Sequence, residues 1–186
     1  TVQRHSERTM SVTKSITLLF LCLCSVAVFA QSAAGLRWDA PSGWVSQGER
    51  PMRAATYTIA PAAGDKAAAE CGVYFFGAGQ GGSVDANLER WKGQFTDPAG
   101  KPAVATVAKR TVRGMPITTI AAAGDYSGLG GPMAASPRPA AGYRLLGAIV
   151  EGPGGNVFIK FTGPAKTIAA NQAKFEQLLA SFQRNK

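Results

Sequence analysis

The stretch YRLLGAIVEGPGGNVFIKF, residues 143–161, decides the fold class. Two runs rich in aliphatic and aromatic residues, 143–150 and 156–161, flank the turn sequence Gly-Pro-Gly-Gly at 152–155. Apolar runs of this length that are bounded by Gly and Pro are typical of strands, and a short turn joins antiparallel neighbours. The stretch therefore predicts a β-hairpin and, with it, an antiparallel sheet.

Other runs with strand character lie on both sides of this hairpin. Strands are expected at 36–38, 52–60, 70–76, 104–112 and 117–123. Arg113-Gly114 is a tight-turn signal between the last two runs, so they form a second predicted hairpin. Residues 124–142 are rich in Gly, Pro, Ala and Ser, and this composition predicts a long mobile loop.

Two segments have the periodicity of helices. Ser83 is a candidate N-cap, and the apolar residues that follow it are spaced four, three and four apart, which predicts a helix over about 84–96. After Gly163-Pro164, a closing helix is expected to place five apolar residues on one face: Ile168, Phe175, Leu178, Leu179 and Phe182. The predicted fold is α+β, an antiparallel sheet of about six to seven strands packed against two amphipathic helices.

The layout of short apolar motifs resembles that of a known fold. These motifs are Trp38-x-x-Pro41-x-Gly43-Trp44 near the start and Phe175-x-x-Leu178-Leu179-x-Ser181-Phe182 in the closing helix. Together with one mid-chain helix and consecutive hairpins, they look like the PsbP-like fold, shared by the photosystem II protein PsbP, the Ran-binding Mog proteins and many exported bacterial proteins. The resemblance covers roughly 36–182 and marks packing, so it transfers no catalytic or ligand residue. It implies a binding or assembly factor.

Residues 10–30, MSVTKSITLLFLCLCSVAVFA, have the layout of a secretory signal peptide. Lys14 is basic, an apolar run follows, and Val28-Phe29-Ala30 is a cleavage site. The run is shorter than the roughly 20 residues that span a bilayer, so we expect no membrane anchor after cleavage, with a retained anchor or lipidation as alternatives. The expected organisation is upstream residues and signal peptide at 1–30 with the start at Met10, a tether at 31–35 and a single α+β domain at 36–186. The expected location is periplasmic or secreted.

Cleavage at this site would leave few residues for nucleophilic or metal chemistry. His5 is the only histidine, Cys22 and Cys24 lie in the signal segment, and Cys71 lies in the apolar run CGVYFF. Histidine-based triads, zinc clusters and internal disulfides are therefore excluded from the mature chain. We expect no cofactor and no metal, and we expect Cys71 to be a buried apolar residue.

The sequence Gly77-Ala-Gly79-Gln-Gly81-Gly82 matches the G-x-G-x-x-G pattern of dinucleotide-binding proteins. That pattern needs a βαβ unit, whereas the surrounding sheet is predicted to be antiparallel. We therefore interpret the glycines as a connection from strand to helix. An anion site at the backbone amides stays open as an alternative.

The remaining signal is an excess of basic residues. The net charge is +9, and loss of Arg4, Glu7, Arg8 and Lys14 with the signal segment would leave +7. Lys109 and Arg113 are four residues apart, so they are candidates to share one strand face and bind a partner, with Arg110 on the opposite face. Arg144 and Lys160 lie on the other hairpin.

These features predict an exported, non-catalytic binding or assembly module of the bacterial cell envelope that engages an anionic envelope component or a protein partner. Nucleic acid is not an expected partner of an exported protein. Two alternatives are a carrier of a small apolar ligand in a cavity between sheet and helix, and a hydrolase with an unrecognised site. The oligomeric state is left open.

Overall fold

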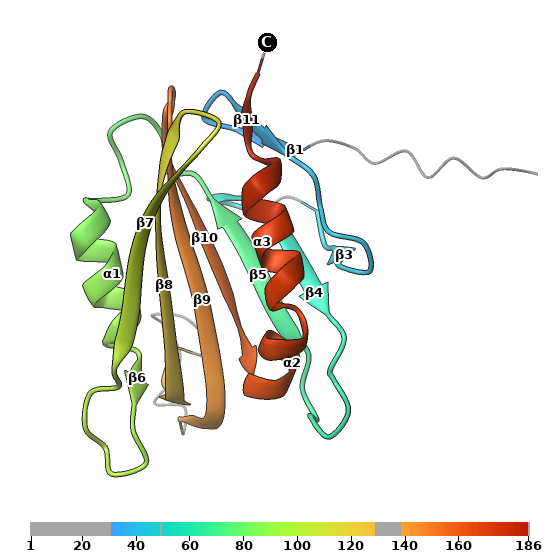
Figure 1. Ribbon diagram of the computed structural model, residues 1–186, viewed down its shortest axis with the longest axis vertical. Coiled ribbons are helices and arrows are strands. Elements are labelled where there is room, and N and C mark those ends of the chain that lie inside the picture. The colour runs from blue at the N-terminus through green and yellow to red at the C-terminus, as the bar shows by residue number, and fades with distance from the viewer. Residues whose placement is uncertain (1–30, 49, 129–138, 186) are drawn as a thin grey trace, which may run out of the picture.

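A computed structural model of the chain describes residues 31–48, 50–128 and 139–185 (Figure 1). The expected signal segment, 1–30, lies outside the described residues. So does the stretch 129–138, which makes up most of the predicted mobile loop.

The larger of two sheets contains eight antiparallel strands. They are β3 (Val45–Ser46), β4 (Arg53–Ile59), β5 (Ala69–Tyr74), β6 (Phe95–Thr96), β7 (Ala105–Val112), β8 (Met115–Tyr126), β9 (Ala140–Gly152) and β10 (Gly155–Pro164). Their order is β3-β4-β5-β10-β9-β8-β6, and β7 also pairs with β8. The α+β prediction and both predicted hairpins, β7–β8 and β9–β10, are confirmed. β8 and β9 extend into both ends of the segment that was expected to be a loop.

A second, three-stranded sheet joins the two ends of the described chain. It contains β1 (Gln31–Ala33), β2 (Leu36–Trp38) and β11 (Gln183–Arg184), in the order β1-β2-β11. Residues 31–35, which we expected to be a tether, thus form a strand and a tight turn. Polar contacts hold Gln31 against the main sheet: the Trp38 indole donates to the Tyr57 hydroxyl at 3.0 Å, and that hydroxyl donates to Gln31 Oε1.

The mid-chain helix, α1 (Val84–Lys92), begins as predicted at Ser83, whose hydroxyl accepts from the Ala86 amide at 3.2 Å. It ends four residues earlier than the predicted limit of 96. Phe95 lies in β6 and pairs with Tyr126 of β8. Phe95 is nevertheless buried, because the strand carries it back against the same apolar cluster as the helix.

The closing helix is two helices, α2 (Ala165–Ala170) and α3 (Gln172–Ser181). The break is at Asn171, where φ is −109°. The Asn171 side chain accepts from the Trp44 indole at 3.1 Å and donates to the Thr167 carbonyl at 3.0 Å. This side chain links the break to the start of the described chain.

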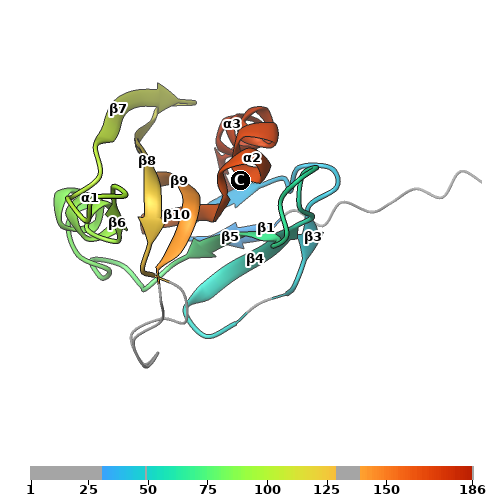
Figure 2. The ribbon, with the colours of Figure 1, turned by 90° about the horizontal axis from the view of Figure 1, so that it is seen from below.

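The main sheet has an apolar cluster on each face. On one face α2 and α3 pack with β2, and Trp38 stacks on Phe182 with ring centroids 5.1 Å apart. On the other face Leu88 and Trp91 of α1 pack over β8 and β9. Figure 2 shows α1 and the α2–α3 pair on opposite sides of β8 and β9. The predicted burial of Trp91, Phe95 and Phe182 is confirmed.

Candidate functional site

A groove of about 650 Å³ lies beside α1, on the face of the main sheet opposite α2 and α3. Its wall includes six aromatic side chains (Tyr74, Phe76, Trp91, Tyr126, Tyr143 and Phe158) and four charged ones (Arg53, Glu70, Arg90 and Lys160). The volume is in the range of small-molecule sites, roughly 300–1,000 Å³. The groove is therefore a candidate binding site with an apolar wall and a few polar groups.

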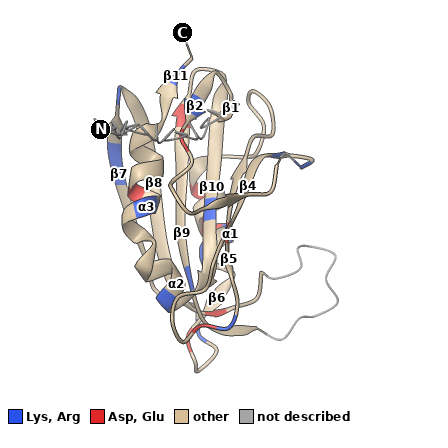
Figure 3. Ribbon diagram, turned by 90° about the vertical axis from the view of Figure 1, so that its right-hand side faces the viewer, with Lys and Arg blue, Asp and Glu red and all other residues tan. Residues whose placement is uncertain are grey.

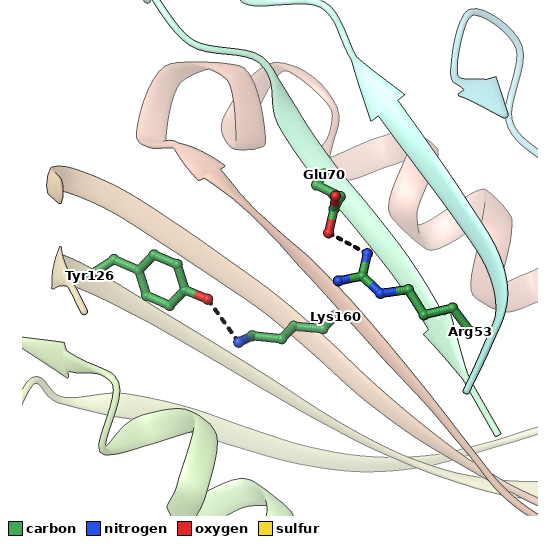
Figure 4. Close-up of polar contacts among 4 residues, drawn as sticks. All are labelled: Arg53, Glu70, Tyr126 and Lys160. Carbon is green, nitrogen blue, oxygen red and sulfur yellow. Dashed lines mark hydrogen bonds and ion pairs between the residues drawn. The ribbon is translucent and has the colours of Figure 1, made fainter. Parts of the chain in front are cut away.

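Lys160 of β10 lines the groove, and its side chain points toward Tyr126 (Figure 4). Side chains alternate between the two faces of a strand, so Phe158, Lys160 and Thr162 share the groove face. Lys160 Nζ donates to the Tyr126 hydroxyl at 2.8 Å and to Gln94 Oε1 at 2.6 Å. These two neutral acceptors hold the partly buried ammonium group.

Glycines flank Lys160 on both neighbouring strands. Lys160 pairs with Gly72 of β5 and with Gly147 of β9. A Cβ atom at Gly72 would lie 2.7 Å from the Tyr74 ring, and one at Gly147 would lie 2.7 Å from the Trp91 ring. The two glycines therefore let these aromatic rings rest against the backbone on either side of Lys160.

The pKa of Lys160 is lowered to about 8. Burial is the largest cause, followed by repulsion from the guanidinium groups of Arg90 and Arg53, while the Glu70 carboxylate acts in the opposite direction. A charge that is both desolvated and surrounded by like charges is characteristic of functional sites.

Arg53 and Glu70 form an ion pair on the β4–β5 side of the groove (Figure 4). Arg53 Nη1 lies 2.7 Å from Glu70 Oε1, and the guanidinium carbon lies 5.1 Å from the centre of the Tyr74 ring. Among the described residues that line the groove, Glu70 is the only carboxylate, against three cations. The groove thus has a local excess of positive charge.

The glycine-rich motif at 77–82 positions Arg90. Asn87 is buried, and its amide nitrogen donates to the carbonyls of Gly81 and Ser83 at 2.8 Å each. Its side-chain oxygen accepts from Arg90 Nη2. A Cβ at Gly81 would lie 2.7 Å from both Phe76 and Phe158. Since β5 pairs antiparallel with β4 and β10, the motif is a strand-to-helix connection that shapes the groove.

Gly124 allows β6 to approach β8 at the other side of the groove. A Cβ there would lie 2.1 Å from the Thr96 carbonyl oxygen. The close approach brings Gln94 to Lys160 and stacks Phe95 on Tyr126 with ring centroids 4.8 Å apart. Burial is the main cause that raises the pKa of Tyr126 to about 12, so its hydroxyl keeps its proton at neutral pH.

The residues singled out as a partner site, Lys109 and Arg113, are exposed and lie outside the groove wall. Lys109 is on β7, whereas Arg113 is in the turn after it, with φ 47°, so the expected common strand face does not extend to Arg113. Arg110 forms an ion pair with Glu176 of α3 at 2.6 Å. Figure 3 shows the basic segments of β7 and β10 on separate parts of the molecule.

Of the basic residues noted on the second hairpin, only Lys160 belongs to the groove. Arg144 precedes Leu145, which lies in the cluster under α1, so Arg144 is on the α2–α3 face. Sequence reasoning missed Arg53, Arg90 and Tyr126. The available signal was a lysine at an alternate position of an otherwise apolar strand, between Phe158 and Thr162.

Within 31–48, 50–128 and 139–185, no three His, Cys, Asp or Glu side chains gather in a way that could hold a metal ion. None of the helices described is both long enough and apolar enough to cross a membrane.

Comparison with known proteins bears on the fold. The chain is similar to the solution structure of cyanobacterial PsbP (CyanoP) from Synechocystis sp. PCC 6803, with 11% sequence identity and a TM-score of 0.50. The match covers 84% of this chain and 90% of that chain. No family model and no curated protein sequence matches. The resemblance to the PsbP-like fold that the sequence motifs indicated is confirmed.

Proposed function

We propose that this protein is a non-catalytic binding module that holds a small organic anion in the groove around Lys160. The observation that carries the proposal is the charge of the groove: Arg53, Arg90 and Lys160 converge on an aromatic wall that has one carboxylate among the described residues. The PsbP-like fold is compatible with a binding or assembly role.

An anionic ligand fits the energetics of Lys160. Holding a partly desolvated ammonium group beside two guanidinium groups costs free energy, and the lowered pKa is the measure of that cost. A bound carboxylate or phosphate would offset the cost through charge-assisted hydrogen bonds. The aromatic wall would bury the apolar body of the same ligand. A purely apolar cargo, the carrier function considered from the sequence, would leave these cations without a partner.

Cys71 and Tyr126 have side chains that often act in catalysis, but their surroundings favour a binding role for the protein. Cys71 is fully buried in the cluster under α2 and α3, and burial raises the pKa of its thiol. A buried, protonated thiol is a poor nucleophile. The Tyr126 hydroxyl is protonated at neutral pH and engaged by Lys160.

The proposal is tested by calorimetric titration of the purified protein with 2-naphthoate and with the neutral analogue 2-naphthalenemethanol. The anion is expected to bind and the alcohol to bind at least about tenfold more weakly, because only the anion pairs with Lys160. Lys160→Met should abolish that preference, with Lys109→Met as the matched control for loss of one lysine. Equal affinity for acid and alcohol would contradict the proposal.

A second contact is proposed at β7, in keeping with export to the cell envelope. β7 pairs with β8 over eight residues, and two exposed basic residues lie there, Lys109 on the strand and Arg113 in the turn after it. An anionic envelope component or an acidic protein partner would be attracted there.

Export is tested at the N-terminus. N-terminal sequencing of the secreted protein is expected to begin at Gln31, and an N-terminus at Met10 would contradict signal cleavage.

A further inference from the structure

We propose that the ligand of the groove is a phosphate monoester with an aromatic or other apolar body, and that its phosphate bridges Lys160 and Arg90. This inference rests on the proposed function, since it names the chemical class of the anion at the same site.

Lys160 and Arg90 together present two positive charges for a ligand to neutralise. Arg53 is already paired with Glu70 at 2.7 Å. Lys160 and Arg90 have no carboxylate partner among the described residues, and repulsion from Arg90 is the largest charge effect on Lys160. A carboxylate carries one negative charge and would leave one of these two cations uncompensated. A phosphate monoester carries about −1.5 to −2 at pH 7 and would compensate both.

Arg90, Lys160 and Tyr126 also supply hydrogen-bond donors to the groove. The guanidinium group of Arg90 has five N–H donors, and one of its Nη2 hydrogens is used by Asn87. Lys160 has three N–H donors, two of which are used by Gln94 and Tyr126. The Tyr126 hydroxyl accepts from Lys160 and keeps its own hydrogen. This set matches the three strong acceptor oxygens of a phosphate monoester better than the two oxygens of a carboxylate.

Arg90 is also held in place by a buried neighbour. Asn87 is 2% exposed and anchored to the carbonyls of Gly81 and Ser83, and it accepts from Arg90. Less side-chain freedom then remains to be lost when Arg90 binds an anion. The groove, at about 650 Å³, also has room for an organic body beside the phosphate, against Tyr74, Trp91 and Phe158.

The experiment compares three ligands that share one aromatic body, by calorimetry at pH 7.5. These are 2-naphthyl phosphate, its singly charged methyl ester and 2-naphthoate. The monoester is expected to bind at least about tenfold more tightly than the other two, because only it compensates both cations. Arg90→Met should reduce the advantage to about threefold or less, while Arg90→Lys, which keeps the charge, should retain part of it. Denaturant unfolding of each variant checks that the fold is intact.

The outcomes separate this inference from the proposed function. If the three anions bind equally well, the phosphate assignment is wrong and the anion-binding groove stands. If none binds, the proposed function is wrong as well. If the monoester is preferred but Arg90→Met and Lys160→Met leave that preference unchanged, the phosphate does not bridge Lys160 and Arg90 and the inference is overturned.

Discussion

Lys160 Nζ lies 2.8 Å from the Tyr126 hydroxyl in the groove that both residues line, and Lys160 has a glycine neighbour on each adjacent strand. Lysine is rarely buried without a carboxylate partner. Here the ammonium group is held by a phenol and an amide, and two guanidinium groups line the same groove. The arrangement carries a cost in stability that ligand binding would offset.

That cost predicts a pH-dependent difference between the wild-type protein and Lys160→Met. The pKa of Lys160 is about 8 in the folded protein against 10.5 for the unperturbed side chain. Between these pH values Lys160 keeps its proton in the unfolded state and loses it in the folded state. The free energy of unfolding of the wild type should therefore rise with pH, and the rise relative to Lys160→Met should be roughly 2 kcal/mol. Below pH 8 the variant should be at least as stable as the wild type. Urea unfolding of both proteins from pH 7 to 10.5 measures this difference. Parallel pH profiles of the unfolding free energy would show that the pKa of Lys160 is not lowered in the folded protein.

Gly147→Ala should damage both stability and binding. The added Cβ would lie 2.7 Å from the Trp91 ring, so the ring must move away from β9. Overpacking of this kind costs roughly 1–3 kcal/mol. The Cβ would also lie 2.8 Å from Ile120 Cγ2, so Trp91→Leu in the same protein should remove part of the cost. The double mutant should then be more stable than the sum of the two single changes predicts. Strict additivity in a double-mutant cycle would contradict this packing.

Phe182→Ala should cost roughly 3–5 kcal/mol of unfolding free energy. Phe182 is fully buried and stacks on Trp38, so its removal opens a cavity where the end of α3 meets β2. Phe182→Leu, which keeps most of the volume, should cost clearly less. Chemical denaturation measures both variants, and a loss below about 1 kcal/mol for the alanine change would mean that α3 does not close the core.

Charge reversal on β7 tests the proposed partner contact. Lys109→Glu combined with Arg113→Glu should weaken binding to vesicles of phosphatidylcholine and phosphatidylglycerol. Binding of the wild type should weaken as the salt concentration rises, because the Debye length falls from about 8 Å at physiological salt to about 3 Å at 1 M. Lys66→Glu with Lys166→Glu makes the same change in net charge at exposed positions elsewhere and should have less effect. If vesicle binding is unaffected by salt and by Lys109→Glu with Arg113→Glu, β7 is not an electrostatic contact.

The parts of the fold that the sequence predicted depend on local patterns. The turn at Arg113-Gly114 needs positive φ at both residues, and the helix start at Ser83 needs one hydroxyl. The break at Asn171 was missed because it depends on Trp44, far away in the sequence. β1 was missed for a similar reason, since Gln31 is held by Tyr57.

The groove could not be predicted because its charged residues come from separate elements. Arg53 lies on β4, Arg90 on α1 and Lys160 on β10, and only the sheet order and the position of α1 bring them together. In the sequence the three residues are far apart from one another. The glycines beside Lys160 have significance only once the strand register is known.

An organic anion bound at Lys160 is the feature on which the proposed function depends. The most direct test is a titration of the 15N-labelled protein with 2-naphthyl phosphate, followed by amide NMR. The largest saturable shifts are predicted at Gly72, Gly147, Lys160 and the end of β8, and they should be lost in Lys160→Met. Shifts that are absent, or that centre on β7 and survive Lys160→Met, would contradict the claim.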